Sequence, residues 1–480
     1  MNPDPNRWKA LAVLGVAYLM VVLDVSIVNV ALPSIQSDLN FSSADSLQWV
    51  ISGYALTFGG FLLLGGRVGD LLGRRMLFMI GLGLFAVTSL ICGLSVSAGM
   101  LIAARLAQGA AGAILSPSVF SIVSVTFEEG SERNKALGIL GAIAGSGAAI
   151  GVLLGGVLTE YLGWEWIFFV NVPIGIAALF LVTRVVHESK AIGLTKHFDT
   201  AGAATVTGSL MLLVYGLTES TSRGWSSGLV IGVLLASIAL MAAFLFIEAR
   251  SRSPLVPLGF FRRRTPTGAN VIGFGLGMVV FGMFFLLSLY MQQVLGFSAL
   301  KTGVGYLAVA LTAVVASVVA QALVSRAGVK PVLTAGLLLL AGGLIYFTRI
   351  SVDGSYFGDL FIGFLLIGVG LGFSFVPVSI AALAGVTGKD AGLASGLINT
   401  TQQIGGALGL AILTTVTSTR ANGLLDRIPP VPRREALTQG FSLAFWVAMG
   451  VAVAAAVTTL FVLRRQELAT MEHETATAQG

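Results

Sequence analysis

The sequence predicts an all-α membrane protein in which fourteen transmembrane helices form two six-helix bundles, with two helices inserted between the bundles. The first observation is composition, because 10% of the 480 residues are charged and 56% are hydrophobic. An average soluble domain has about 25% charged residues. A soluble chain cannot bury that much apolar surface, so the surrounding solvent must be lipid. The other two observations are the regular spacing of long apolar segments and a loop motif that recurs in the second half.

The apolar segments are each close to the ~20 residues that cross a hydrocarbon layer of ~30 Å. They lie at about 10–32, 49–66, 76–95, 99–122, 136–158, 166–185, 200–217, 227–247, 268–290, 302–324, 331–349, 357–380, 393–416 and 441–463. The first segment is too long for a cleavable signal peptide and carries Asp24 in its middle, so we interpret it as a transmembrane helix.

Lysine and arginine fix the expected orientation. Most of them fall in the segments that are cytoplasmic if the N-terminus is placed in the cytoplasm. Cytoplasmic loops are enriched in these residues, so we expect both termini in the cytoplasm. The first three outer loops have no lysine or arginine. The last outer loop breaks the pattern, with Arg420, Arg427, Arg433 and Arg434.

An internal repeat defines the two halves. The stretch LLLGGRVGDLLGRRMLF follows the second segment and VVAQALVSRAGVKPVLT follows the tenth, so that Gly73 aligns with Gly328 and Arg75 with Lys330. Two related bundles that meet at a central cavity are a transporter plan. The predicted parts are an N-terminal bundle at 1–190, two inserted helices at 191–250, a cytoplasmic linker at 251–266, a C-terminal bundle at 267–464 and a cytoplasmic tail at 465–480.

The two inserted helices carry no ionisable side chain at membrane depth. Their polar residues are mostly small: Thr205, Thr207, Ser209 and Ser237. Such hydroxyl groups can bond to carbonyl groups of their own helix. We therefore expect this pair to pack on the outside of the two bundles.

Several kinds of chemistry are absent from the sequence. There is no Gly-x-x-x-x-Gly-Lys-Ser/Thr phosphate loop, no Ser/His/Asp set and no cluster of His and Cys with metal-ligand spacing. The single cysteine, Cys92, excludes an internal disulfide, and the net charge of +6 is too diffuse to indicate a nucleic acid partner. We predict no enzymatic activity, no metal and no other cofactor.

Two ionisable residues lie deep in the apolar segments, and such residues are costly in lipid and usually functional. Asp24 is nine residues before Pro33, which places it about 13 Å from the outer end of the first segment. Arg105 is about 9 Å from the outer end of the fourth. An acid and a base at similar depth form a candidate proton switch. The alternative is a structural ion pair that holds the first bundle together.

Three motifs stand out in the apolar segments: LDVSIVNVALPSI at 23–35, RLAQG at 105–109 and GLASGLINTTQQIGGALG at 392–409. Together they resemble motifs of the fourteen-span drug:proton antiporters of the major facilitator superfamily. The glycine-rich helix at 138–156 is similar to the family's antiporter motif at Gly138, Gly147, Gly151, Gly155 and Gly156, although Val152 replaces the usual proline. Gly-x-x-x-Gly spacing also permits close helix packing in any membrane protein, so both interpretations stay open.

The loop after the second segment resembles the superfamily's best-known signature, at Gly66, Asp70, Gly73, Arg74 and Arg75. Glycine allows a tight turn there. Asp70 can then accept hydrogen bonds from a helix N-terminus or pair with a neighbouring base such as Arg133, as a latch on the cytoplasmic side. Simple anchoring of the two arginines at the membrane surface is the alternative.

Candidate residues of a substrate cavity are aromatic or amide side chains of the bundle helices: Tyr54, Phe58, Gln108, Phe281, Asn399 and Gln402. Amides at membrane depth avoid lipid, whereas an aromatic stripe such as that of the ninth segment more often faces lipid or the core than a cavity.

The resemblance implies a monomeric, proton-coupled antiporter of a bacterial plasma membrane that exports hydrophobic or amphipathic drugs by alternating access. Its partners would be the small-molecule substrate, protons and the bilayer. Two alternatives remain: a dedicated exporter of one endogenous metabolite or lipid, and a membrane receptor or enzyme that keeps the scaffold without transport.

Overall fold

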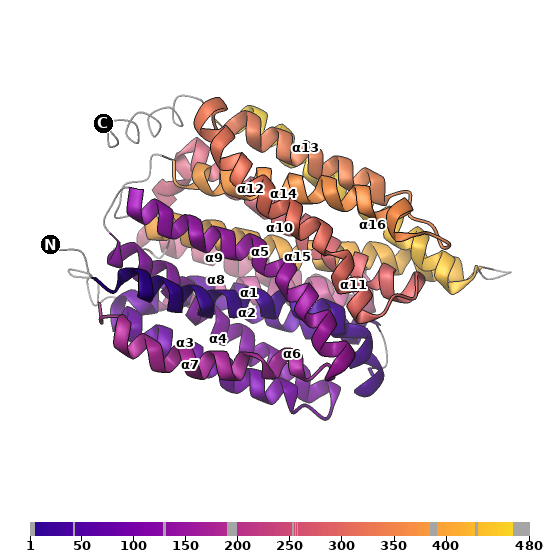
Figure 1. Cartoon of the computed structure of the whole chain (residues 1–480), viewed down its shortest axis with the longest axis horizontal. Helices are drawn as coiled ribbons and strands as arrows, with labels where there is room; N and C mark the ends of the chain where they lie inside the picture. Colours follow the sequence, from indigo (N-terminus) through magenta and orange to yellow (C-terminus); the bar gives the residue numbers. More distant parts are fainter. Residues whose placement is uncertain are drawn as a thin grey trace.

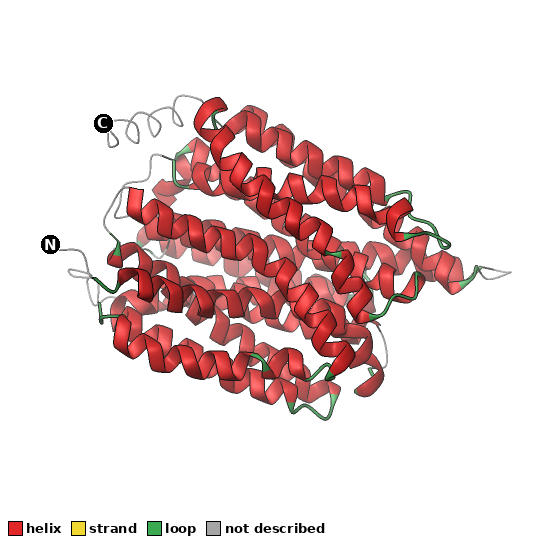
Figure 2. Cartoon of the chain, in the orientation of Figure 1, coloured by secondary structure: helices red, strands yellow, loops and turns green. Residues whose placement is uncertain are grey.

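The computed structural model describes residues 5–41, 44–127, 131–189, 199–251, 254, 256, 258–384, 391–427 and 431–463. Within some helices, including the one that carries Asp70, the side chains of a few residues lie outside the description. The described part consists of helices joined by short loops and contains no strand (Figure 2).

The first half and the inserted pair comprise nine helices of the described chain. They are α1 (Arg7–Asp38), α2 (Ala44–Leu72), α3 (Arg74–Gly93), α4 (Ala98–Thr126), α5 (Ser131–Tyr161), α6 (Trp166–Phe169), α7 (Asn171–Val185), α8 (Thr200–Arg223) and α9 (Gly228–Arg250).

The second half begins with the short helix η1 and ends with α16. Its described helices are η1 (Leu258–Arg262), α10 (Arg264–Leu289), η2 (Tyr290–Val294), α11 (Ala299–Gly305), α12 (Leu307–Ala327), α13 (Val329–Phe347), η3 (Tyr356–Leu360), α14 (Phe361–Ala382), α15 (Ala391–Leu425) and α16 (Arg433–Val462).

The predicted spans are confirmed. With α6/α7, α10/η2, α11/α12 and η3/α14 each taken as one crossing, the described helices make fourteen spans that cover the predicted segments. Eleven of the spans meet the length and hydropathy of a membrane helix over their described residues. Several helices start at a side-chain cap: the Ser97 hydroxyl accepts from the Met100 N–H, and the Asp199 carboxylate accepts from the Gly202 N–H.

The helices run side by side along the long axis of the molecule, and α1 begins at the same end at which α16 ends (Figure 1). We call this end the terminal end and the opposite one the distal end. The N-terminal bundle is built from α1–α7, with α1 packed on α5 and α2 and α3 packed on α4. The C-terminal bundle is built from α10–α16, with α10 packed on α15 and α13 on α14. The bundles meet where α5 contacts α11 and α12 and where α2 contacts α15.

The turn that carries the superfamily-like signature is shorter than predicted. Helix α2 continues through Gly66 and Asp70 to Leu72, and α3 starts at Arg74, so the expected loop is the single residue Gly73. Gly73 has a φ of +125°, a conformation that favours glycine. The predicted repeat is present here, because Gly328, with a φ of +83°, is likewise the only residue between α12 and α13.

The two inserted helices differ in how they contact the bundles. Helix α9 packs on α8 and is largely exposed. Helix α8 also contacts α2 and α15, and so it covers the line at which the two bundles meet. Thr205 bonds to the carbonyl of Ala201 in its own helix, as expected, but Thr207 donates to the Gly60 carbonyl of α2 at 2.8 Å. The hydroxyl groups of α8 thus bond both within their own helix and to the neighbouring bundle.

Candidate functional site

The two deep ionisable residues form an ion pair inside the N-terminal bundle. Arg105 Nη1 on α4 lies 2.5 Å from Asp24 Oδ2 on α1. The exposed fractions of the two side chains are 1% and 0%. The similar depth predicted from helix rise thus corresponds to direct contact.

Three further polar side chains complete a hydrogen-bond network around the Asp24 carboxylate. Gln108 Nε2 and Asn171 Nδ2 donate to Asp24 Oδ1 at 2.8 and 3.1 Å. Both amides also donate to the Ser89 hydroxyl, at 2.7 and 3.3 Å. Arg105 Nη1 in turn donates to Gln108 Oε1 at 2.6 Å. The network joins α1, α3, α4 and α7 and is buried throughout.

The remaining faces of the Arg105 guanidinium are also occupied. Its Nε donates to the Val50 carbonyl at 2.9 Å. The Tyr54 ring lies 4.4 Å and the Phe168 ring 5.7 Å from its central carbon, at distances typical of cation–π contacts. Besides Asp24, the cation therefore has a carbonyl, an amide and two aromatic partners.

The antiporter-like glycines of α5 have two different neighbours. A Cβ atom on Gly147 would lie 2.8 Å from a Val22 methyl, and one on Gly155 would lie 2.8 Å from the Ile27 carbonyl oxygen. A Cβ on Gly151 would overlap the Ser26 hydroxyl. These three glycines therefore allow α5 to pack closely against the part of α1 that carries Asp24. For Gly138 the structure describes only the backbone, within α5.

Gly156 faces the other bundle. A Cβ atom there would lie 2.7 Å from the Ala299 carbonyl oxygen of α11, and one on Gly303 would lie 2.8 Å from the Val152 carbonyl oxygen. Close by, Gln292 Nε2 donates to the Val30 carbonyl at 3.1 Å, which joins η2 to α1. The two bundles are thus in backbone-to-backbone contact toward the distal end.

The signature at the end of α2 is tied to the segment after α7. The backbone N–H groups of Arg75 and Met76 donate to the Glu188 carboxylate at 3.1 and 3.0 Å. The Arg74 N–H donates to the Ser189 carbonyl at 3.0 Å. The acid that accepts hydrogen bonds from the N-terminus of α3 is therefore Glu188, a residue that the sequence analysis did not select.

The side chain of Asp70 lies outside the described residues, and its proposed pairing with Arg133 stays a prediction. Arg133 Nε donates to the Phe127 carbonyl at 3.1 Å.

Each predicted cavity residue makes its described contacts within its own bundle. Tyr54 and Phe58 stack at 5.5 Å and press against Gly112 of α4, and Gln108 belongs to the Asp24 network. In the other bundle the Phe281 ring packs on Gly406, and Gln402 contacts Gly273 and Gly277 of α10. Asn399 is half-buried on α15. Whether these side chains contact a substrate stays a prediction.

Two network members, Ser89 and Asn171, were missed at the sequence level. Asn171 carried a usable signal, because it is an amide inside the predicted span at 166–185, and amides at membrane depth avoid lipid. Ser89 carried none, since serine in a membrane helix usually bonds to its own backbone.

Comparison with known proteins agrees with the fold and with the motifs. A family model of the Major Facilitator Superfamily matches residues 14–410. A puromycin resistance protein of Streptomyces alboniger is 39% identical over 462 residues, which cover 95% of this chain and 91% of that protein. A cephamycin export protein of Amycolatopsis lactamdurans is 40% identical over 86% of each chain.

A tetracenomycin C resistance and export protein of Streptomyces glaucescens is 32% identical, over 96% of this chain and 92% of that protein. Among solved structures, the human organic anion transporter MFSD10 superposes with a TM-score of 0.66 at 17% identity, over 95% of this chain and 99% of that one. The last similarity concerns the fold alone.

These findings define a multi-pass membrane transporter. The chain belongs to the major facilitator superfamily.

Proposed function

We propose that this transporter exports hydrophobic or amphipathic antibiotic-like molecules from a bacterial cell in exchange for protons. The substrate class is supported by three relatives, which are named for resistance to or export of puromycin, cephamycin and tetracenomycin C. Proton coupling is supported by one observation above all, the buried Asp24–Arg105 pair with its surrounding network. The chain works as a monomer, and the terminal end faces the cytoplasm, in line with its lysine and arginine content.

The proposed coupling runs from Asp24 to the contact between the bundles. Protonation of Asp24 removes its charge and weakens its bonds to Arg105, Gln108 and Asn171. The neighbouring turns of α1 bear directly on Gly147, Gly151 and Gly155 of α5. The other side of α5 meets α11 through Gly156.

A small shift of α1 would therefore displace α5 and change its contact with α11. A packed interface of this kind switches between discrete arrangements and does not deform continuously. The bundles would then rock about the bound substrate and open one end at a time.

A narrower substrate range is a second candidate. Each of the three relatives is named for one compound, which favours a dedicated exporter of one metabolite over a multidrug carrier.

The test uses purified full-length protein in vesicles that contain a pH-sensitive dye. A transported compound should move protons in the opposite direction, and an imposed pH gradient should drive its accumulation. If substrate moves without any proton flux, the antiport assignment is wrong. A panel of chemically unrelated antibiotics then separates the two substrate ranges.

A further inference from the structure

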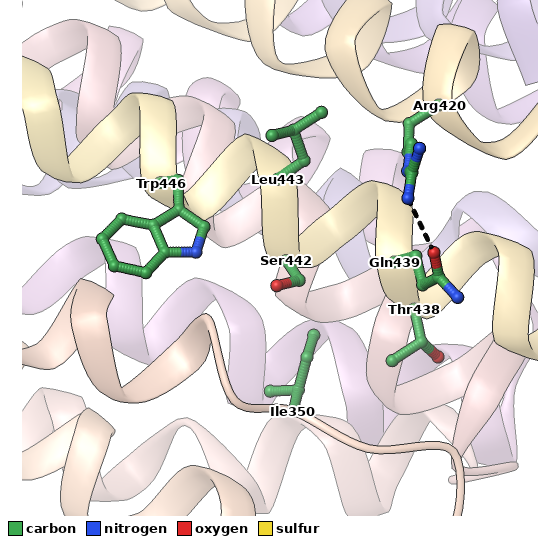
Figure 3. A pocket seen from close by; sticks show the side chains of 7 residues that line it. All are labelled: Ile350, Arg420, Thr438, Gln439, Ser442, Leu443 and Trp446. Atoms are coloured by element: carbon green, nitrogen blue, oxygen red, sulfur yellow. Dashed lines mark hydrogen bonds between the residues drawn. The ribbon is translucent and has the colours of Figure 1, made fainter.

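A pocket of about 400 Å³ opens at the distal end of the C-terminal bundle, away from the ion pair (Figure 3). It lies between the last turns of α15, the first half of α16 and the loop after α13. Arg420 and Gln439 lie on one side, and Leu443 and Trp446 continue along α16. The pocket therefore has a charged part and an apolar part.

The polar part is built around Arg420. Its Nη2 donates to Gln439 Oε1 at 3.0 Å, whereas a guanidinium carries five N–H donors in all. Gln439 Nε2 is in turn 3.5 Å from the Glu435 carboxylate. Ser442, at the floor, donates its hydroxyl to the Thr348 carbonyl at 2.6 Å and keeps its oxygen as an acceptor. The Arg420 side chain is exposed and available to an anion.

The electrostatic surroundings favour an anion. Arg434 is four residues before Thr438, another wall residue, and so shares its face of α16. Arg349 directly precedes the wall residue Ile350. Of the acids of the same end, Asp353 is exposed three residues after Ile350, and Asp359 accepts from Ser351 and Ser355. The acids of the segment between α15 and α16 are Asp426 and Glu435, against the arginines Arg420, Arg427, Arg433 and Arg434.

An apolar stripe leads from the pocket along α16. Leu443, Trp446, Val453, Val457 and Leu460 are all exposed, with 37% to 49% of each residue accessible, and follow one another on one face at intervals of three, seven, four and three residues. Gly450 interrupts the stripe, and a Cβ atom there would meet nothing within 4 Å. The stripe thus has a shallow notch and the length of several helical turns, which suits an acyl chain.

We propose that this pocket binds an anionic membrane phospholipid from the leaflet at the distal end. Arg420 holds the phosphate by charge-assisted hydrogen bonds, and the acyl chains lie on the distal part of the stripe, at Leu443 and Trp446. Trp446 lies between the two parts, five residues inside the predicted span at 441–463, where it can contact an acyl chain. Basic pockets between transmembrane helices bind anionic head groups by the same chemistry. This lipid would give Arg420, one of the four arginines of the last outer loop, a binding role.

The experiment titrates the purified full-length protein in detergent with a short-chain phosphatidylglycerol whose acyl chains carry bromine. Bromine quenches tryptophan fluorescence on contact, and the variant Trp446→Phe identifies the contribution of this one of six tryptophans. We expect saturable quenching that Trp446→Phe removes. Arg420→Gln should weaken lipid binding about tenfold, because it loses a charge-assisted bond.

Matched variants and ligands make the result specific. Arg420→Lys keeps the charge and should retain most of the affinity. Arg427→Gln removes an exposed arginine of the same loop that does not line the pocket, and it should weaken binding much less than Arg420→Gln. Brominated phosphatidylcholine should bind more weakly, and soluble glycerol phosphate should not displace the lipid. Equal binding of both lipids, equal loss in Arg427→Gln, or displacement by glycerol phosphate would each overturn the proposal.

Discussion

Arg75 and Lys330 occupy equivalent places in the two bundles. Each is the second residue of a helix that follows a single positive-φ glycine, Gly73 or Gly328. Arg75 Nη1 donates to the Val186 carbonyl just beyond α7, at 3.1 Å. Lys330 Nζ donates to the Leu460 carbonyl near the end of α16, at 2.5 Å. In both halves a cation thus caps the final helix of its bundle, where carbonyl groups lack helical partners.

Replacement of either cation should destabilise its own bundle. We expect Arg75→Met and Lys330→Met each to lower the free energy of unfolding by about 1–2 kcal/mol, because a hydrogen bond from a charged donor to a helix end is lost. Thermal unfolding in detergent measures the change. Arg326→Met is the control, since Arg326 is exposed at the same end of the molecule. An equal loss in the control would mean that general surface charge, not the cap, stabilises the protein.

Variants of the Asp24–Arg105 pair should distinguish its effect on stability from its effect on proton coupling. Asp24→Asn leaves a buried guanidinium without its counter-ion, so we expect a loss of about 3–5 kcal/mol in unfolding free energy together with loss of gradient-driven transport. The double variant Asp24→Asn/Arg105→Gln removes the unpaired charge and should regain part of the stability but none of the transport.

Melting temperature and proton-driven uptake in vesicles measure the two effects. Asp353→Asn makes the same chemical change on an exposed loop and should alter neither. Gradient-driven transport by the double variant would show that Asp24 has a structural role alone.

The glycine face of α5 should not tolerate a methyl group beside Asp24. In Gly151→Ala the new Cβ would overlap the Ser26 hydroxyl and lie 3.0 Å from the Leu23 carbonyl oxygen. We expect a loss of about 1–3 kcal/mol, typical of an overpacked core, and impaired transport. Ser26→Ala in the same chain should restore part of both by removing the hydroxyl.

Gly450→Ala is the matched control in an open position, and thermal unfolding with a transport assay reports the outcome. If Gly151→Ala is as stable and active as Gly450→Ala, α5 and α1 are not held at this distance during the cycle.

The contact between α5 and α11 should govern access from the distal end. Gly156→Leu would force apart two backbones, since even its Cβ would lie 2.7 Å from the Ala299 carbonyl oxygen. A cysteine at Val152, which is 1% exposed, reports on the same seam once the buried native cysteine is replaced by Cys92→Ser. We expect Gly156→Leu to raise its reaction rate with an impermeant thiol reagent about tenfold, which corresponds to a population shift of about 1.4 kcal/mol.

Gly232→Leu adds the same side chain where no atom lies within 4 Å and should leave the rate unchanged. An unaltered rate in Gly156→Leu would place the distal gate elsewhere.

The sequence predicted most of the scaffold because few physical choices are open to it in lipid. Apolar length determines a span, and a fixed rise per residue made it possible to compare the depths of Asp24 and Arg105. The repeat around Gly73 and Gly328 is recognisable in the sequence because a one-residue turn with positive φ favours glycine in both halves.

Other features depend on contacts between distant segments. Glycine is tolerated inside membrane helices, so the sequence of α2 did not reveal that the helix continues through Gly66 to Leu72. The partnership of Glu188 with α3 joins residues more than a hundred positions apart, and no local pattern encodes it. The direction in which Thr207 donates was equally hidden, because a threonine hydroxyl can serve its own helix or a neighbour.

Helix α8 should move with the N-terminal bundle and slide over α15. Thr207 ties it to α2 through the Gly60 carbonyl, and a Cβ on Gly60 would lie 2.9 Å from Met211 Cγ of α8. Toward α15, by contrast, α8 contributes apolar residues such as Val214, which shares a buried cluster with Ala407. Apolar side chains of this kind can slide past each other without breaking directed hydrogen bonds.

Two disulfide variants in the Cys92→Ser background test this assignment. The pair Gly60→Cys/Met211→Cys links α8 to α2 and should leave substrate transport intact after oxidation, because these helices move together. The pair Val214→Cys/Ala407→Cys links α8 to α15 and should stop transport until a reductant is added, because the bundles can no longer rock. Each reduced variant is its own control for folding. Arrest by the first link, or free transport with the second, would mean that α8 travels with the C-terminal bundle instead.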